Sequence, residues 1–342
     1  MLRCNNLDMT SLLLKLCRCE PTLKCQQCSY VKTIIPQRYD ADNPNELPWP
    51  VSLYIDPYDR IFIVDKMCDR VLLMVAQDDI YSAAIAGDTE NTKIYDRLFC
   101  PTSVYYEEEN YSLIIADAGS RRIIRWLFTE GSIRRRFKAW WKNTQCETLI
   151  EDIDCFGIAV DDRGFLYVVD SVKGQVTRWP LRGVSGLLKL GVHGKVVAGG
   201  NGCGNCLDQL NNPSYIFVDQ DYSIIISDTG NNRIMIWFEG SPSGKTLAGG
   251  RGRGNKLDQL SSPQGITFDN FGRVYIADAG NSRVVRWTPG ATEGEILVDS
   301  SASKDEFNQV TDPRGFAWDN EGHLYVADAK IGRILKFKID DS

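Results

Sequence analysis

Six aspartates, each at the end of a short apolar run, recur along the chain at intervals of 50 to 58 residues. A large apolar or aromatic residue stands nine positions after each of them, in the pairs Asp65/Met74, Asp117/Trp126, Asp170/Trp179, Asp228/Trp237, Asp278/Trp287 and Asp328/Phe337. In five copies the fifth position after the Asp is arginine, namely Arg70, Arg122, Arg233, Arg283 and Arg333. The third copy has Gln175 there. A period near fifty in a strand-like pattern indicates one unit copied six times, which restricts the chain to a repeat fold.

Composition narrows the class of protein only a little. Apolar residues make up 43% and charged residues 25% of the chain, as in ordinary globular proteins. The net charge of −6 disfavours a broad nucleic-acid surface, because phosphate binding depends on clustered Lys and Arg. No apolar run approaches the ~18 residues of a membrane span, and the stretch at residues 11–16 makes a poor signal peptide. We therefore expect a cytoplasmic protein without membrane contact.

The fifth copy shows how each unit is built. Pro263 opens it, and residues 265–269 alternate like a strand. A turn with Gly272 leads to a second strand at residues 273–277, which Asp278 ends. A third strand follows at residues 283–287 and a fourth at residues 295–298. Pro50, Pro101, Pro213 and Pro313 open other copies, and the third has Cys155 at this place.

Four short antiparallel strands, repeated six times, predict an all-β fold, the six-bladed β-propeller. The expected blades are residues 50–89, 101–142, 155–200, 213–250, 263–299 and 313–340. The sixth copy stops after its third strand, so residues 30–35 are expected to supply the fourth. Ile35 lies fifteen residues before Pro50, the interval that separates Ala198 from Pro213. The domain prediction is a cysteine-rich segment at residues 1–29 and a propeller at residues 30–342.

The units resemble NHL repeats. The resemblance rests on the Ala-Gly-Gly-x-Gly-x-Gly linkers at residues 198–204 and 248–254, the strand-ending Asp, and the Asn-x-Arg triplets at residues 231–233 and 281–283. It covers roughly residues 30–340 and is weakest in the first two copies. NHL propellers form the substrate- or RNA-binding end of many tripartite-motif and RING ubiquitin ligases. Only five cysteines precede the propeller, too few for the about eight ligands of a RING, so the resemblance implies at most an adaptor role.

The recurring Asp and Arg allow two interpretations. They could form a ring of carboxylates for a metal or sugar, or each Asp could bind its own turn and pair with the Arg that opens the next strand. Recurrence in six copies favours the second interpretation, because a site needs residues that differ from their copies.

Three stretches depart from the repeat and are candidate binding sites. The first holds basic and aromatic residues that suit an acidic peptide or a nucleic acid, Arg134, Arg135, Arg136, Lys138, Trp140 and Trp141. Its alternative is the outer strand of the second blade, with a charged solvent face. The second comprises Arg251 and Arg253 in a glycine-rich linker, which lacks the helix and the Lys-Ser/Thr pair of a phosphate loop. Strand topology places this linker at the same end as the turns that follow the aspartates.

The third stretch is a group of cysteines at Cys17, Cys19, Cys25 and Cys28. Four thiolates could hold zinc, and Cys-x2-Cys is a usual half-site. Disulfides, or a remnant of a longer N-terminal domain, are the alternatives.

Enzymatic activity is the less favoured interpretation. The amidating lyase related to NHL propellers uses a histidine-ligated zinc, whereas this chain has only His193 and His323. Acidic residues at the ends of the first strands, which a calcium-dependent lactonase or esterase would need, occur once per blade and so belong to the repeat. We therefore expect a non-catalytic scaffold that binds protein, or RNA, with a small-molecule substrate disfavoured. The alternative is a propeller hydrolase or lyase.

Overall fold

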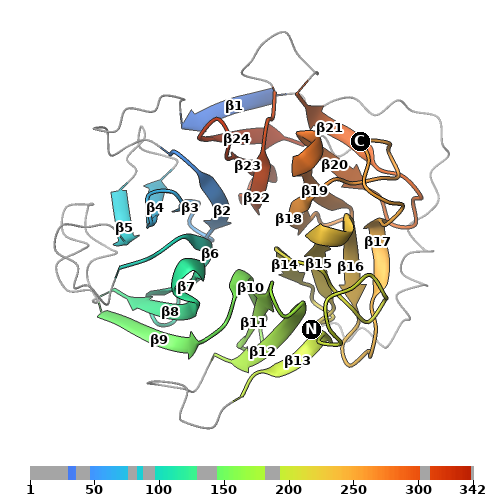
Figure 1. Ribbon diagram of the computed structural model, residues 1–342. Helices are drawn as coiled ribbons and strands as arrows, with labels where there is room; N and C mark the ends of the chain where they lie inside the picture. Colours follow the sequence, from blue (N-terminus) through green and yellow to red (C-terminus); the bar gives the residue numbers. More distant parts are fainter. Residues whose placement is uncertain are drawn as a thin grey trace, which may run out of the picture.

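The computed structural model describes residues 30–35, 47–75, 83–87, 97–128, 145–181, 193–300 and 309–339. Within these residues the strands form six four-stranded antiparallel sheets. Figure 1 shows the sheets arranged as blades around a central axis. The predicted six-bladed β-propeller is confirmed.

The first three blades consist of strands β2 to β13. Their bounds are β2 (Pro50–Ile55), β3 (Arg60–Asp65), β4 (Arg70–Val75), β5 (Ala83–Gly87), β6 (Pro101–Glu107), β7 (Ser112–Asp117), β8 (Arg122–Leu127), β9 (Gln145–Glu151), β10 (Cys155–Val160), β11 (Phe165–Asp170), β12 (Gln175–Pro180) and β13 (Lys195–Gly199).

The last three blades consist of β14 to β24 together with β1. Their bounds are β14 (Ile216–Val218), β15 (Ile224–Asp228), β16 (Arg233–Trp237), β17 (Lys245–Gly249), β18 (Pro263–Phe268), β19 (Val274–Asp278), β20 (Arg283–Trp287), β21 (Glu295–Asp299), β22 (Pro313–Trp318), β23 (His323–Asp328), β24 (Arg333–Lys338) and β1 (Tyr30–Ile35). Single 3-10 turns follow three of the aspartates, at η2 (Ala118–Ser120), η3 (Thr229–Asn231) and η4 (Ala279–Asn281).

The sixth blade combines the two ends of the described chain. Its strand order is β1-β24-β23-β22, and β1 pairs antiparallel with β24 from Tyr30 opposite Lys338 to Thr33 opposite Leu335. Figure 1 shows β1 as the outermost strand of this blade. Backbone hydrogen bonds between distant parts of the sequence therefore join the ring.

The second blade departs from its expected bounds. Its outer strand is β9, which pairs with β8 from Arg122 opposite Glu151 to Leu127 opposite Gln145. The described outer strand therefore lies beyond residue 142, the expected end of this blade, while residues 134–141 lie outside the described residues. The connection between β8 and β9 is long, while only residues 152–154 separate β9 from β10. The long connection and the short linker together have about the length expected for one repeat. The interval between Asp117 and Asp170 therefore gives no sign that the outer strand lies later in the sequence.

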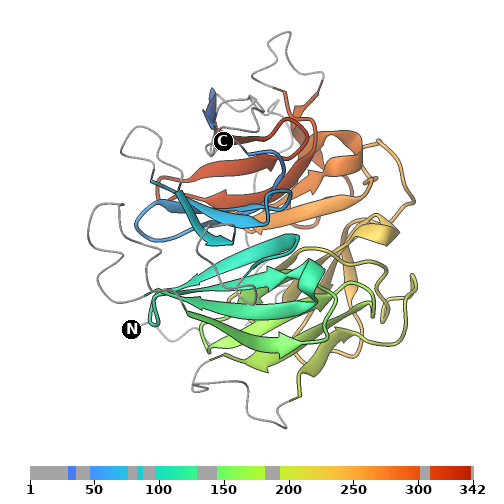
Figure 2. The same cartoon turned by 60° about the vertical axis from the view of Figure 1, so that its left-hand side comes forward.

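The two ends of the blades form two different faces of the disc. One carries the turns after the aspartates together with the linkers between blades, and we call it the linker face. The other carries the turns between the first and second strands of each blade. Figure 2 shows the disc from another side, where the antiparallel strands of neighbouring blades lie next to one another.

The core lies between neighbouring blades. Trp287 of blade 5, for example, packs in one cluster with Ile225 and Ile234 of blade 4. The apolar residue nine positions after the Asp is at most 4% exposed in five blades. In the third blade Trp179 is only partly buried, and its indole N–H donates to Thr177 Oγ1 at 2.9 Å. The core prediction is therefore confirmed for five of the six positions.

Candidate functional site

The strand-ending aspartates anchor the turns of the linker face. Asp278 Oδ2 accepts hydrogen bonds from Arg283 Nε and Asn281 Nδ2, both at 2.7 Å, and its Oδ1 accepts from the Ser261 amide at 2.6 Å. Asp278 is fully buried, and this burial raises its pKa against the effects of the three donors. The five Asp–Arg pairs have N–O distances of 2.7–3.2 Å. This geometry agrees with the interpretation that the pairs stabilise the turns.

The paired arginines also hold the linkers that precede their blades. Arg283 donates to three backbone carbonyls of its linker, those of Asn255 at 2.8 Å, Lys256 at 3.0 Å and Gln259 at 2.9 Å. Arg233 makes the same three contacts with the linker at residues 205–209. The guanidinium therefore joins a turn to a linker, a role that the spacing of the repeat does not reveal.

The third blade lacks the arginine for a visible reason. The linker that enters it has only three residues between β9 and β10, too few to form the carbonyl cage seen around Arg233 and Arg283. Lys173 takes over the charge, with Nζ 3.5 Å from Asp170 Oδ2, and its amide donates to Asp170 Oδ1 at 3.0 Å. Gln175 thus marks a short linker.

Arg251 and Arg253 lie on a linker whose backbone is duplicated elsewhere in the chain. Gly254 donates to the Leu260 carbonyl at 3.2 Å, as Gly204 does to Leu210 in the other linker. Arg251 is 64% exposed at its side chain and lies 3.6 Å from the Asp258 carboxylate. Arg253 Nε donates to Ser261 Oγ at 3.0 Å.

The equivalent positions in the other linker are Asn201 and Cys203. The same backbone therefore forms without either arginine. Both charged side chains are exposed on the linker face.

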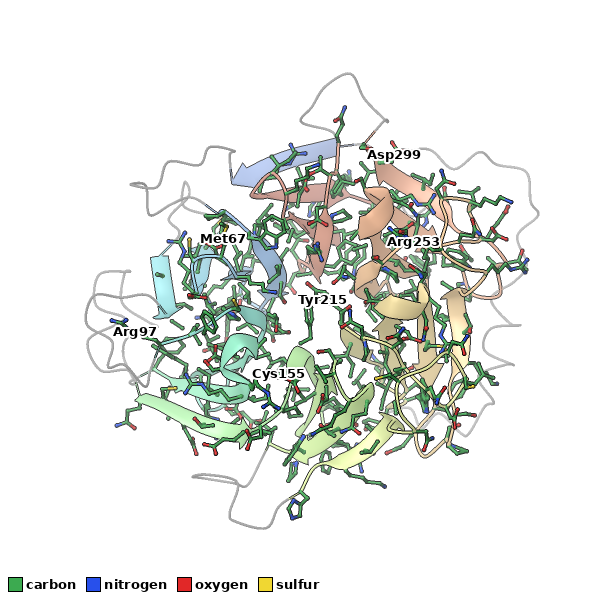
Figure 3. All side chains as sticks on the ribbon, viewed as in Figure 1. Met67, Arg97, Cys155, Tyr215, Arg253 and Asp299 are labelled. Carbon is green, nitrogen blue, oxygen red and sulfur yellow. The ribbon has the colours of Figure 1, made fainter. Side chains whose placement is uncertain are left out.

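Tyr215 crosses the axis of the propeller. It stands just before β14 in blade 4, and its hydroxyl donates to the Val51 carbonyl of β2 in blade 1, the opposite blade. Figure 3 shows Tyr215 at the centre of the ring, with Arg253 far from the axis. Burial raises the Tyr215 pKa well above its usual range. The side chain therefore joins two opposite blades across the axis.

Five residues gather at the linker-face end of the channel, and we call them the channel mouth. They are Lys66, Phe156, Gln264, Asp312 and Arg314. The Phe156 ring meets the Tyr215 ring edge-on, with centroids 5.6 Å apart. Lys66 Nζ lies 5.8 Å from the Phe156 ring centroid. Sequence reasoning missed this group, because its members come from four different blades.

A carboxylate and histidine group lies on the opposite face of blade 6. Ligand atoms of Asp319, Glu321 and His323 lie within 4.8 Å of one another. However, the Lys336 ammonium is already 2.8 Å from Asp319 Oδ2. The other histidine, His193, is exposed beside β13.

Two predicted sites fall outside the described residues. These are the basic and aromatic residues Arg134, Arg135, Arg136, Lys138, Trp140 and Trp141, and the cysteines Cys17, Cys19, Cys25 and Cys28. Both sites stay predictions. Within the described part of the chain, no helix is long and apolar enough to cross a membrane.

Comparisons with known proteins support the fold. Residues 260–287 match the NHL repeat family model. No curated protein matches the chain significantly. An auxiliary nutrient binding protein from Bacteroides thetaiotaomicron has a similar structure, with a TM-score of 0.66, 14% identity, and coverage of 90% of this chain and 76% of that one. A catalytically inactive virginiamycin B lyase from Staphylococcus aureus with quinupristin has a TM-score of 0.56, 12% identity, and coverage of 91% and 99%. The chain is therefore a six-bladed β-propeller protein that contains an NHL repeat.

Proposed function

We propose that the chain is a non-catalytic scaffold that binds a protein partner through its linker face. The proposal rests on one observation: residues that differ between equivalent positions of the repeat gather on this face. Arg251 and Arg253 stand where the other duplicated linker has Asn201 and Cys203, on the same backbone. A side chain that the backbone does not require, on a linker whose hydrogen bonds are duplicated elsewhere in the chain, is suited to recognition.

The electrostatics favour a protein over a nucleic acid. The chain as a whole carries a charge of −6, and Arg251 lies beside the Asp258 carboxylate. A nucleic acid is bound mainly through many clustered cations, whereas a protein interface needs only a few buried anchors and charges. By resemblance to NHL ligases, the partner would be a protein that the scaffold delivers to a ubiquitin-ligase-type assembly.

Affinity capture with quantitative mass spectrometry tests this function. We expect the double variant Arg251→Glu/Arg253→Glu to lose the proteins that the unaltered chain retains after nuclease treatment. The matched control Lys195→Glu/Lys245→Glu makes the same charge change on the outer strands β13 and β17. Loss of all captured proteins on nuclease treatment would indicate RNA instead. An unaltered list of proteins for the linker variant would overturn the proposal.

The segment at residues 134–141 gives a second, separate test of partner binding. The described strands before and after it, β8 and β9, pair Leu127 with Gln145 at the end of blade 2 opposite the linker face. Changing Arg134, Arg135 and Arg136 to Glu should therefore remove captured proteins, and these should differ from the proteins that the linker variant loses. An unchanged list would exclude this segment as a binding site.

A propeller hydrolase or lyase is the second candidate, favoured by the carboxylate and histidine group of blade 6. Metal analysis of the purified protein and an ester and lactone panel test it. Calcium or zinc that depends on His323, together with turnover, would support an enzyme. Zinc that disappears in Cys17→Ser/Cys25→Ser would instead support the predicted N-terminal site. Absence of both metal and turnover contradicts the enzyme.

A further inference from the structure

Two sets of equivalent residues surround the linker-face end of the channel. The first set directly follows the aspartates: Lys66, Ala118, Ser171, Thr229, Ala279 and Ala329. The second set is the second residue of each innermost strand segment: Val51, Thr102, Phe156, Ser214, Gln264 and Arg314. The opening proline or Cys155 pairs with the strand-ending Asp in five blades, so both sets lie at one level. One cation stands out in each set, Lys66 and Arg314.

Lys66 leans over the channel. It belongs to blade 1, and its ammonium lies 5.8 Å from the ring of Phe156 in blade 3. No ion pair engages Lys66 among the described residues, and its side chain is partly exposed. A cation held over an aromatic face keeps its charge available to an anion.

Arg314 comes from blade 6, the blade next to that of Lys66. Its Nε and Nη2 both donate to Asp312 Oδ2, at 3.0 and 2.9 Å. Its side chain is 25% exposed. The positive charge of Arg314 acts on the Tyr215 hydroxyl, whose ring contacts Phe156. Tyr215 therefore lies near Arg314 and against Phe156, whose ring lies 5.8 Å from the Lys66 ammonium.

The charges of the mouth suit a monoanion. Lys66 and Arg314 contribute two positive charges and Asp312 one negative charge, which leaves a single positive charge. We propose that the channel mouth is a binding site for a carboxylate group, with Lys66 and Arg314 as its cations and Phe156 and Tyr215 as an apolar floor. The inference rests on the proposed function, since it assigns the mouth to an acidic side chain or terminus of the protein partner.

Gln264 favours a carboxylate carried by a peptide. Its Oε1 atom is buried and has no hydrogen-bond partner. The backbone after Gln264 adjoins that of Arg314, because a Cβ added to Gly265 would lie 2.0 Å from the Arg314 carbonyl oxygen. Buried acceptors normally have a donor, and a peptide whose binding turns the Gln264 side chain toward it would bring an amide N–H group together with its carboxylate. A free dicarboxylic acid brings only acceptors.

Calorimetry at low ionic strength tests the site, with an acetylated and amidated hexaglutamate peptide as the probe. We expect hexaglutamate to bind and hexaglutamine not to bind. Lys66→Met and Arg314→Met should each weaken binding by about tenfold or more. The control Lys245→Met, on the outer strand β17, should leave the affinity unchanged. If Arg314→Met fails to fold because Asp312 loses its partner, Lys66→Met alone decides the question.

Competition identifies the source of the carboxylate. Displacement of the peptide by succinate would show that a free acid suffices, and no displacement would show that the peptide is required. Tighter binding of inorganic phosphate than of either would overturn the carboxylate assignment. So would an unaltered affinity in Lys66→Met or an absence of hexaglutamate binding.

The outcomes also separate this inference from the proposed function. Partner capture that depends on Arg251 and Arg253, combined with peptide binding that ignores Lys66, would sink the carboxylate site alone. Peptide binding that depends on Lys66, with no protein captured through the linker face, would sink the proposed scaffold function alone.

Discussion

Removing the carboxylate of Asp278 should destabilise the propeller more than removing any exposed carboxylate of the same linker face. The Asp278 side chain is fully buried and the Arg283 side chain is 5% exposed. The change Asp278→Ala leaves Arg283 Nε and the Ser261 amide without an acceptor, and it removes one of the two acceptors of Asn281 Nδ2. Arg283 keeps its three carbonyl contacts, so its charge cannot turn to solvent without releasing the linker.

The expected loss is about 3–5 kcal/mol in the free energy of unfolding, the cost of breaking a buried ion pair by removing one partner. For a chain of this size that corresponds to a fall in Tm of roughly 6–10 °C, at about 2 °C per kcal/mol. Asp258 supplies the matched control, because its carboxylate pairs with an exposed arginine at 3.6 Å. Asp258→Ala should cost only about 0–1 kcal/mol.

Urea unfolding, followed by tryptophan fluorescence, measures both variants, and a scanning thermal melt gives Tm. The double variant Asp278→Ala/Arg283→Met completes a double-mutant cycle. Arg283→Met should cost less in the Asp278→Ala background than in the unaltered chain, because the arginine has already lost its carboxylate partner there. Equal losses for Asp278→Ala and Asp258→Ala would refute the argument that the repeated pairs are structural. Additive losses in the cycle would refute the coupling of Asp278 with Arg283.

Three further predictions concern the core, the thiols and the opposite face. Trp287→Ala should cost about 3–5 kcal/mol in urea unfolding, because it leaves a cavity between blades 4 and 5; a loss below ~1 kcal/mol would contradict its place in the core. Burial and the charge of a nearby aspartate raise the pKa of Cys155 to about 12, so iodoacetamide at pH 8 should label exposed Cys203 in the native protein and Cys155 only after unfolding, as mapped by mass spectrometry. Burial raises the pKa of Asp319, but the Lys336 ammonium at 2.8 Å and other donors lower it overall from 3.8. The ionised carboxylate therefore adds stability above pH 3.8, and this stability is lost as the pH falls through the lower pKa of the folded state. Lys336→Met should thus lower the free energy of unfolding at pH 6 and lower it progressively less below pH 3.8. An equal loss at pH 6 and below pH 3.8 would exclude the pairing.

The sequence predicts the architecture well because the repeat records it several times. The Asp residue, the arginine and the aromatic residue each mark a fixed register of one blade, so one misread copy is corrected by five others. The exception is blade 2, where the outer strand β9 lies beyond the expected end of the blade. There the long connection after β8 and the short linker at residues 152–154 offset each other, and no spacing signal distinguishes the two arrangements.

The candidate sites are less predictable, because they depend on contacts between copies. Exposed Arg251 and Arg253 could be read from the sequence as departures from the other linker. The linker cage around Arg283 could have been suspected from a second signal, the Asn-x-x-x-Gln pattern shared by residues 205–209 and 255–259. The contact of Tyr215 with Val51 has no such signal. It joins residues 164 positions apart that meet only once the ring has closed.

Because buried Asp–Arg pairs stabilise the repeats, effects on stability and on binding can be separated experimentally. The residue at one position is replaced by the residue that another repeat has at the equivalent position. Lys66 occupies a position that three other blades fill with alanine, and Arg251 one that the sister linker fills with asparagine. Lys66→Ala and Arg251→Asn therefore insert residues that the same frame already accepts. Surface changes of this kind cost within about 0.5 kcal/mol, so both variants should unfold in urea like the unaltered chain, while Lys66→Ala loses hexaglutamate and Arg251→Asn weakens partner capture. A large loss of stability in either variant would mean that the cation supports the frame itself, and its use for recognition would then have to be abandoned.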